Sequence, residues 1–132
     1  MGTQKPAPKP LNIFFDVDQT LVFVSQHENA LRPGTKEAMQ RITDAGHTIY
    51  VWSAGGEDYS KRTVQKHGLG DWVEDCFDKH PRVEPKPDLI IDDDWYLVEK
   101  YGGYCVTQYR AVDEDDREFH RVVQELEQHG HL

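Results

Sequence analysis

Carboxylate side chains recur directly after two short apolar segments of the chain. Asp16 and Asp18 follow the run 11–15, and Asp92 to Asp94 follow the run 88–91. Grouped carboxylates repel one another, so they either take up protons or hold a cation. Oxygen ligands select a hard ion, and Mg²⁺ commonly binds one or two carboxylates together with substrate phosphate. The two groups therefore indicate chemistry at a hard divalent cation.

Hydroxyl and amine side chains accompany these acids along the chain. Thr20 comes shortly after the first acidic group, and Ser53 follows another apolar run. Lys86 lies six residues before the second acidic group and is our first choice for the amine, with Lys79 as the alternative. A cation and an ammonium would neutralise a phosphate dianion, and the hydroxyls would hydrogen-bond to its oxygens. Phosphoryl transfer requires this positioning and charge balance.

Asp16 and Asp18 can divide the work of such a reaction. A carboxylate at the end of a rigid strand can attack phosphorus and form an aspartyl phosphate. A second group must protonate the leaving oxygen and later activate water. Asp18 is only two residues from Asp16, which is near enough for that general acid/base role.

The segments that must position these residues alternate between strand and helix patterns. Segment 21–31 is expected to be a hairpin-like excursion, and 72–77 fits a strand or a helical turn equally well. Thr35 and Asp94 are the expected N-caps of two helices. The other expected strands are 11–15, 47–52, 88–91 and 104–107, and the expected helices are 36–45, 57–67, 95–101 and 113–128. This alternation predicts a three-layer, Rossmann-like α/β fold with a parallel sheet and helices on both faces. In such sheets ligands bind at the carboxyl ends of the strands, where the acids and Ser53 fall.

Length and composition predict one domain over 11–132, preceded by a flexible tail over 1–10. The chain has 132 residues, of which 37% are hydrophobic and 30% charged, and no apolar run approaches the ~20 residues of a membrane helix. Cys76 and Cys105 lack metal-ligand spacing, so we expect reduced thiols and a cytoplasmic protein. The net charge of −9 argues against non-specific nucleic-acid binding but leaves a local basic patch open.

In this order the segments resemble the four signature motifs of the haloacid dehalogenase-like (HAD) hydrolase superfamily. The resemblance spans residues 11–107, and the matching segments are Asp16-Val17-Asp18-Gln19-Thr20 after a strand, Ser53 ending a strand, Lys86, and Asp92-Asp93 ending a strand. It implies a Rossmann-like sheet, bound Mg²⁺ and an aspartyl-phosphate intermediate. By the same resemblance Asp16 is both nucleophile and metal ligand. Asp18 would give its carbonyl to the metal and its side chain to acid/base work.

Two details of the motifs narrow the expectation. An acid at Asp18 resembles the phosphatases and phosphotransferases of the superfamily, because its dehalogenases and P-type ATPases lack one there. In the last motif the resemblance favours Asp93 as the direct metal ligand with Asp92 behind it, although either acid fits.

Many members of this superfamily carry a cap domain, inserted either after the first motif or between the second and third. The spacing of the motifs in this chain leaves no room for one. Thr20 and Ser53 are 33 residues apart, and so are Ser53 and Lys86, and the expected elements use up both stretches. We therefore expect an open, capless site. An open site excludes water poorly. Either a bulky phosphoprotein or polynucleotide end covers it, or a second subunit does, and a small sugar or nucleotide phosphate also remains open.

Three other kinds of protein share parts of this pattern. An EF-hand calcium loop needs Gly and Glu where this chain has Leu21 and His27. A response-regulator receiver domain has its lysine last, whereas here an acidic group follows the lysine. A non-catalytic phosphate-binding or regulatory module is the remaining alternative, and the presence of both Asp16 and Asp18 argues against it.

Overall fold

A computed structural model describes residues 7–132, so the first part of the predicted tail, residues 1–6, lies outside the described residues. Residues 7–11 precede the first strand without regular secondary structure. No helix in the described part of the chain is long and apolar enough to cross a membrane.

The centre of the fold is a parallel sheet of five strands in the order β5-β4-β1-β6-β7. Its strands are β1 (Asn12–Asp16), β4 (Thr48–Ser53), β5 (Val73–Asp78), β6 (Leu89–Asp92) and β7 (Gly103–Cys105). Every neighbouring pair is parallel. The chain first builds outward from β1 to β4 and β5, then returns to the other side of β1 for β6 and β7. The direction of winding therefore reverses between β1 and β6, and such switch points are where ligands bind in open α/β sheets.

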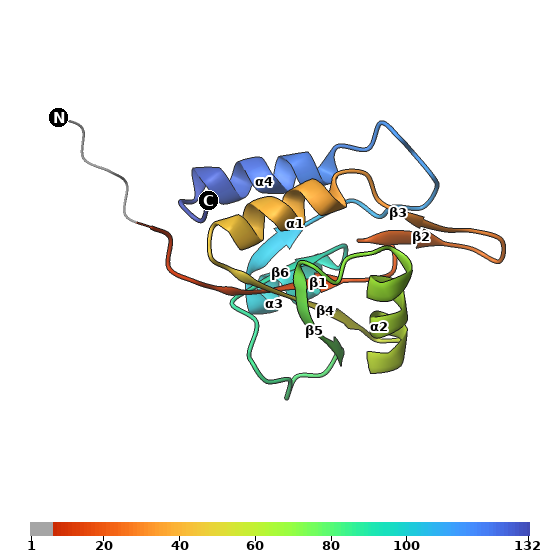
Figure 1. The fold of residues 1–132 in the computed structure, drawn as a ribbon, viewed down its shortest axis with the longest axis horizontal. Helices are drawn as coiled ribbons and strands as arrows, with labels where there is room; N and C mark the ends of the chain where they lie inside the picture. The colour runs from red at the N-terminus through yellow and green to blue at the C-terminus, as the bar shows by residue number, and fades with distance from the viewer. Residues whose placement is uncertain (1–6) are drawn as a thin grey trace.

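Helices cover both faces of this sheet (Figure 1). On one face, buried residues of α1 (Thr35–Asp44), α2 (Glu57–Lys66) and α4 (Glu118–Gln128) form one core with Ile13 and Phe15 of β1. On the other face Phe14 packs with Leu97 and Val98 of α3 (Trp95–Tyr101). Right-handed crossovers that run in opposite directions from the switch point place their helices on opposite faces. The predicted Rossmann-like α/β layering is confirmed.

Two segments whose secondary structure the sequence left open form strands in the structure. The excursion is a two-stranded antiparallel hairpin, β2 (Val22–Val24) and β3 (Asn29–Leu31), which projects from the body of the molecule (Figure 1). The ambiguous segment 72–77 is β5, an edge strand paired with β4. Of the two structures that the sequence allowed for this segment, the strand is correct, and it is the fifth strand of the sheet.

Two predicted helix starts are wrong. Gly34 is the N-cap of α1, and the Thr35 hydroxyl instead donates to the carbonyl of Arg32 at 2.7 Å. The last helix begins at Glu118 and not at residue 113, because the acids before it form turns: Asp113 accepts a hydrogen bond from the amide of Asp115. Asp94 is the N-cap of α3, as predicted, and accepts hydrogen bonds from two amides of its first turn.

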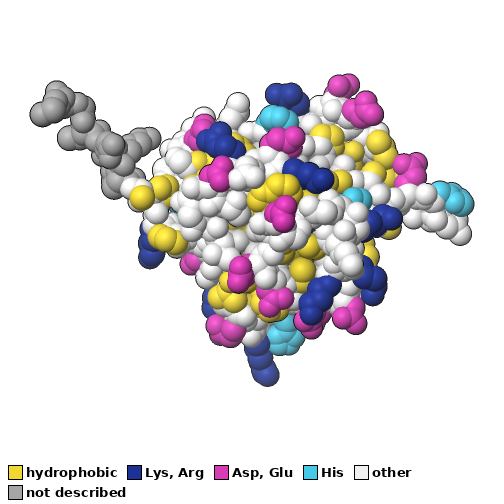
Figure 2. Space-filling model, in the orientation of Figure 1, with side chains coloured by type: hydrophobic (Ala, Val, Ile, Leu, Met, Phe, Trp, Pro, Cys, Tyr) yellow, Lys and Arg dark blue, Asp and Glu magenta, His cyan; other side chains and the backbone are white. Residues whose placement is uncertain are grey.

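Charged side chains are mixed on the face that Figure 2 shows, where acidic and basic groups alternate without a large patch of one sign. This distribution gives that face no basic surface for a polynucleotide backbone.

Candidate active site

The acidic residues meet where two adjacent strands end. Asp16 is the last residue of β1, Asp92 is the last residue of β6, and the two strands pair in register one residue earlier, at Phe15 and Ile91. Asp93 follows directly. One carboxylate oxygen from each of Asp16, Asp92 and Asp93 lies within 4.8 Å of the others, and this group could hold a metal ion.

A lysine is held against these carboxylates, and it is Lys79. Its Nζ lies 3.0 Å from Asp16 Oδ1 and 2.7 Å from Asp92 Oδ2. The backbone explains its position. Residue 78 ends β5, and the amide of Lys79 then donates to the carbonyl of Ser53 at 2.9 Å. Lys79 therefore leaves the sheet at the carboxyl edge, where the acids lie.

Lys86, the first choice from the sequence, does not reach the acids. Its Nζ donates to the carbonyl of Pro81 at 3.0 Å and its side chain is 59% exposed. Lys86 precedes the amino end of β6, and Asp88 binds the backbone of Asn12 at the start of β1. At Lys86 the chain has therefore crossed most of the way to the amino edge of the sheet, away from the acids. Lys79, the alternative lysine, lies beside the acids instead.

Thr20 joins two of the carboxylates. Its buried Oγ1 lies 2.9 Å from Asp16 Oδ2 and 3.0 Å from Asp93 Oδ1, and it accepts the amide hydrogen of Asp93 at 3.0 Å. A hydroxyl has a single hydrogen to donate. Only one of the two carboxylates receives this hydrogen at a time.

Burial and mutual repulsion set the protonation of the group. Burial, followed by the negative charge of Asp92, raises the pKa of Asp16 to about 8, although Lys79 works in the opposite direction. Burial also raises the pKa of Asp92. Burial disfavours the charged form of Asp93 as well, but hydrogen bonds from Asp16 and Thr20 outweigh it and lower the pKa of Asp93. Three carboxylates against one ammonium leave a formal charge of −2 when all are ionised, which a divalent cation would neutralise.

Asp18 stands apart from the converging carboxylates. Its side chain is exposed and accepts a hydrogen bond from the Tyr59 hydroxyl of α2. Burial, and then that hydrogen bond to the Asp18 carboxylate, raise the pKa of Tyr59, which keeps the phenol protonated. Asp18 is thus oriented by a neighbouring donor while it remains open to solvent.

Ser53 ends β4 in a buried position beside this edge. Its Oγ accepts a hydrogen bond from the amide of Gly55 at 3.0 Å, and its carbonyl accepts one from Lys79. The hydroxyl hydrogen has no acceptor among the described residues. Ser53 therefore stabilises the turn after β4, and its hydroxyl hydrogen remains available to donate.

Sequence reasoning missed Arg32, the buried cation that supports the loop after β1. Its guanidinium binds Asp116 at 2.8 and 3.0 Å and reaches the carbonyl of Thr20 at 3.3 Å. The plane lies over the rings of Tyr109 and Phe119. Nothing in the local sequence marks this role, because Asp116, Tyr109 and Phe119 lie more than 70 residues away in the chain.

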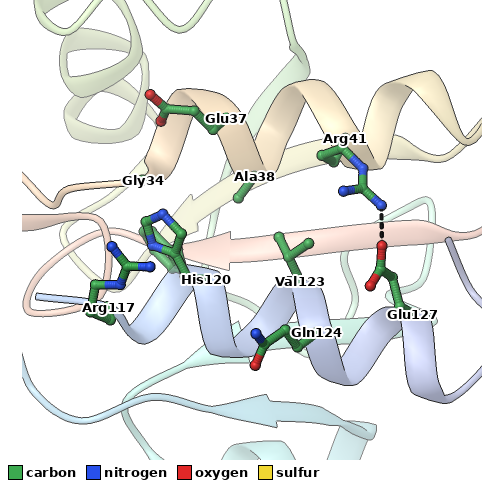
Figure 3. Close-up of a pocket in the computed structure, with 10 residues that line it drawn as sticks. Gly34, Glu37, Ala38, Arg41, Arg117, His120, Val123, Gln124 and Glu127 are labelled. Atoms are coloured by element: carbon green, nitrogen blue, oxygen red, sulfur yellow. Dashed lines mark hydrogen bonds and ion pairs between the residues drawn. The ribbon is translucent and has the colours of Figure 1, made fainter.

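The groove drawn in Figure 3 belongs to another part of the molecule. It lies between α1 and α4, has a volume of about 260 Å³, and is bordered by Gly34, His120 and the Arg41–Glu127 ion pair. None of its lining residues belongs to the acidic group. The site at the carboxyl edge is therefore the better candidate for chemistry.

Comparison with known proteins supports the fold alone. No protein-family profile matches the chain, and no curated protein sequence matches it. Among solved structures the chain is similar to an uncharacterized protein from Listeria monocytogenes serotype 4b, with a TM-score of 0.58 and 12% sequence identity over 89% of this chain and 97% of that one. At this identity the likeness shows a shared α/β architecture.

Proposed function

We propose that this chain is a Mg²⁺-dependent phosphatase of the HAD type that hydrolyses a phosphate monoester through an aspartyl phosphate on Asp16. One observation carries the proposal: three strand-end carboxylates and Lys79 converge at the switch point of a parallel sheet. The motif resemblance rests on sequence order, and the convergence adds the distances between these side chains, with Lys79 in place of Lys86.

The residues present fit a hard divalent cation. The donors are carboxylate oxygens without a nitrogen or sulfur ligand, as Mg²⁺ requires. Asp92 Oδ2 is buried, and Lys79 Nζ lies 2.7 Å from it. Asp16, Asp93 and Asp92 would hold the ion, with the carbonyl of Asp18 as a further ligand. Bound there, Mg²⁺ would offset the negative charge of the phosphate.

In the proposed reaction a carboxylate oxygen of Asp16 attacks phosphorus as the ester P–O bond breaks. Asp18 gives its proton to the leaving alcohol oxygen. Asp18, now ionised, takes a proton from water, the water oxygen attacks phosphorus, and the P–O bond to Asp16 breaks to release inorganic phosphate. Lys79 lowers the pKa of Asp16, which favours the attacking ionised form, and holds the carboxylate in place. Thr20 and the free donor of Ser53 orient Asp16 and the phosphate oxygens.

We also propose that the site is capless. The residues between the first and second motif form the short hairpin and α1, and those between Ser53 and Lys79 form α2 and β5. A macromolecular substrate or a second copy of the chain would then shield the site from water. A phosphotransferase reaction differs only in the acceptor, which would be an alcohol in place of water.

The test is hydrolysis of phenyl phosphate with and without Mg²⁺, by the wild type, Asp16→Asn and Asp18→Asn. We expect Mg²⁺-dependent release of phosphate by the wild type only. Equal rates for wild type and Asp16→Asn would remove Asp16 as the nucleophile. Binding of inorganic phosphate and Mg²⁺ without turnover of any monoester would favour the non-catalytic module.

A further inference from the structure

A second cavity adjoins the acidic group on the α3 side of the sheet. Its volume is about 180 Å³, and it is lined by Trp52, Lys79, His80, Pro81, Leu97, Lys100 and Tyr101. Trp52 pairs in register with Asp16 across adjacent strands. Lys79 belongs to both places: its Nζ is 3.0 Å from Asp16 Oδ1 and 5.8 Å from the centre of the Trp52 ring. The cavity therefore lies immediately beside the reacting carboxylate.

The wall of this cavity offers hydrogen-bond donors and no carboxylate. Trp52 is 1% exposed, and its indole Nε1 has no hydrogen-bond partner among the described residues. A buried N–H without an acceptor is costly and is normally satisfied by a ligand or water. His80 accepts the amide hydrogen of Arg82 at Nδ1, so its neutral ring carries the hydrogen on Nε2 as another donor.

Lys100 supplies a free positive charge at the same wall. Its Nζ lies 5.3 Å from the centre of the Tyr101 ring, and it makes no ion pair with any residue from 7 to 132. Lys79 is already paired with Asp16 and Asp92, so Lys100 supplies the available positive charge of the cavity. In a chain of net charge −9, one unpaired ammonium, two further donors and a lining without an acid among residues 7–132 favour a negatively charged ligand.

We propose that this cavity receives the leaving group of the substrate, and that this group carries a second anion. The inference rests on the proposed phosphatase function and narrows its substrate to phosphate monoesters with an additional carboxylate or phosphate. Tyr101, Leu97 and Pro81 would cover the carbon skeleton, while Lys100 would bind the anion close to the buried Trp52 N–H. A volume of about 180 Å³ suits a small organic group.

Two matched pairs of compounds test this. The first compares kcat/KM for 4-carboxyphenyl phosphate and phenyl phosphate, which differ only in the carboxylate. The second compares binding of 4-hydroxybenzoate and phenol to the full chain by the Trp52 indole N–H signal in ¹H–¹⁵N NMR, assigned with Trp52→Phe. Each is run on the wild type, on Lys100→Gln, and on Lys86→Gln as the control lysine outside the cavity.

We expect the carboxylated ester to be preferred about tenfold, as one charge-assisted hydrogen bond allows, and only 4-hydroxybenzoate to shift the indole signal. Lys100→Gln should remove both effects and Lys86→Gln neither. An indole shift without hydrolysis of either ester would support the cavity and count against the phosphatase. Hydrolysis of both esters at equal kcat/KM without an indole shift would overturn the cavity proposal and leave the phosphatase standing.

Discussion

Replacing Lys79 by Met should damage both stability and activity. The side chain is 15% exposed, and its partners Asp16 and Asp92 are 10% and 1% exposed. Removing one member of a buried ion pair costs about 3–5 kcal/mol, because the remaining charge is left uncompensated. Asp16 can relieve part of this by binding a proton, since its pKa is already raised to about 8. We therefore expect the lower end, about 3 kcal/mol, which lowers Tm by roughly 10 °C in a chain of this size.

Lys86→Met is the matched control for this experiment. Its lysine is 59% exposed and its nearest carboxylate, on Glu84, is 3.9 Å away, so the expected cost is below about 0.5 kcal/mol. Urea unfolding at pH 7 with EDTA gives the free energies, and phenyl phosphate hydrolysis with Mg²⁺ gives kcat. Loss of Lys79 should lower kcat by about 100-fold or more, as loss of one positioned donor does elsewhere. Equal effects of the two substitutions, or a larger one at Lys86, would refute the placement of Lys79.

Three further predictions address the support of the site. Gly103→Ala should lower the free energy of unfolding in urea by about 3 kcal/mol, because φ at this glycine is +140° and a Cβ there would lie 1.9 Å from the carbonyl oxygen of Ile90. Gly46→Ala is the control: its φ is also positive, but no described atom lies within 4 Å of the added Cβ, so it should lower the free energy of unfolding by only about 1 kcal/mol. Arg32→Lys should lower stability by about 2 kcal/mol, since an ammonium cannot reproduce the two bonds to Asp116 and the contact to Thr20, and a change below 0.5 kcal/mol would contradict that network. The folded-state pKa of Asp16 lies above its ordinary value near 4, so between these two pH values the folded chain binds a proton that the unfolded chain does not. With EDTA present, Tm should therefore fall as pH rises from about 4 to 8, and Mg²⁺ should reverse the loss at pH 8. A Tm that is flat with pH and unmoved by Mg²⁺ would count against the cation site.

The convergence of the acids was predictable because it depends on a short-range rule. Asp16 and Asp92 each end a buried apolar strand, and parallel strands bring their carboxyl ends to one edge. This convergence could be predicted without knowing any individual contact between side chains. The same rule would have selected Lys79 over Lys86, had the segment 72–77 been recognised as a strand, since Lys79 directly follows its carboxyl end.

Long-range packing explains what the sequence left hidden. Arg32 acquires its role only when α4 brings Asp116 beside it, and the Tyr59 bond to Asp18 depends on how α2 sits against the first loop. Among the described residues the Trp52 N–H has no partner, and this too depends on the surrounding wall and not on the residue type. Such contacts join residues with no fixed spacing, so periodicity and local motifs carry no signal for them.

A phosphoryl group carried by Asp16 is the central intermediate of the proposed reaction. The wild type would be mixed with phenyl phosphate and Mg²⁺, quenched in acid within one turnover, reduced with borohydride and digested for mass spectrometry. An acyl phosphate on Asp16 would be reduced to homoserine, so we expect that modification at residue 16, absent from samples without substrate. Hydrolysis that proceeds with Asp16 unmodified, or modification of a different acid, would contradict the central claim.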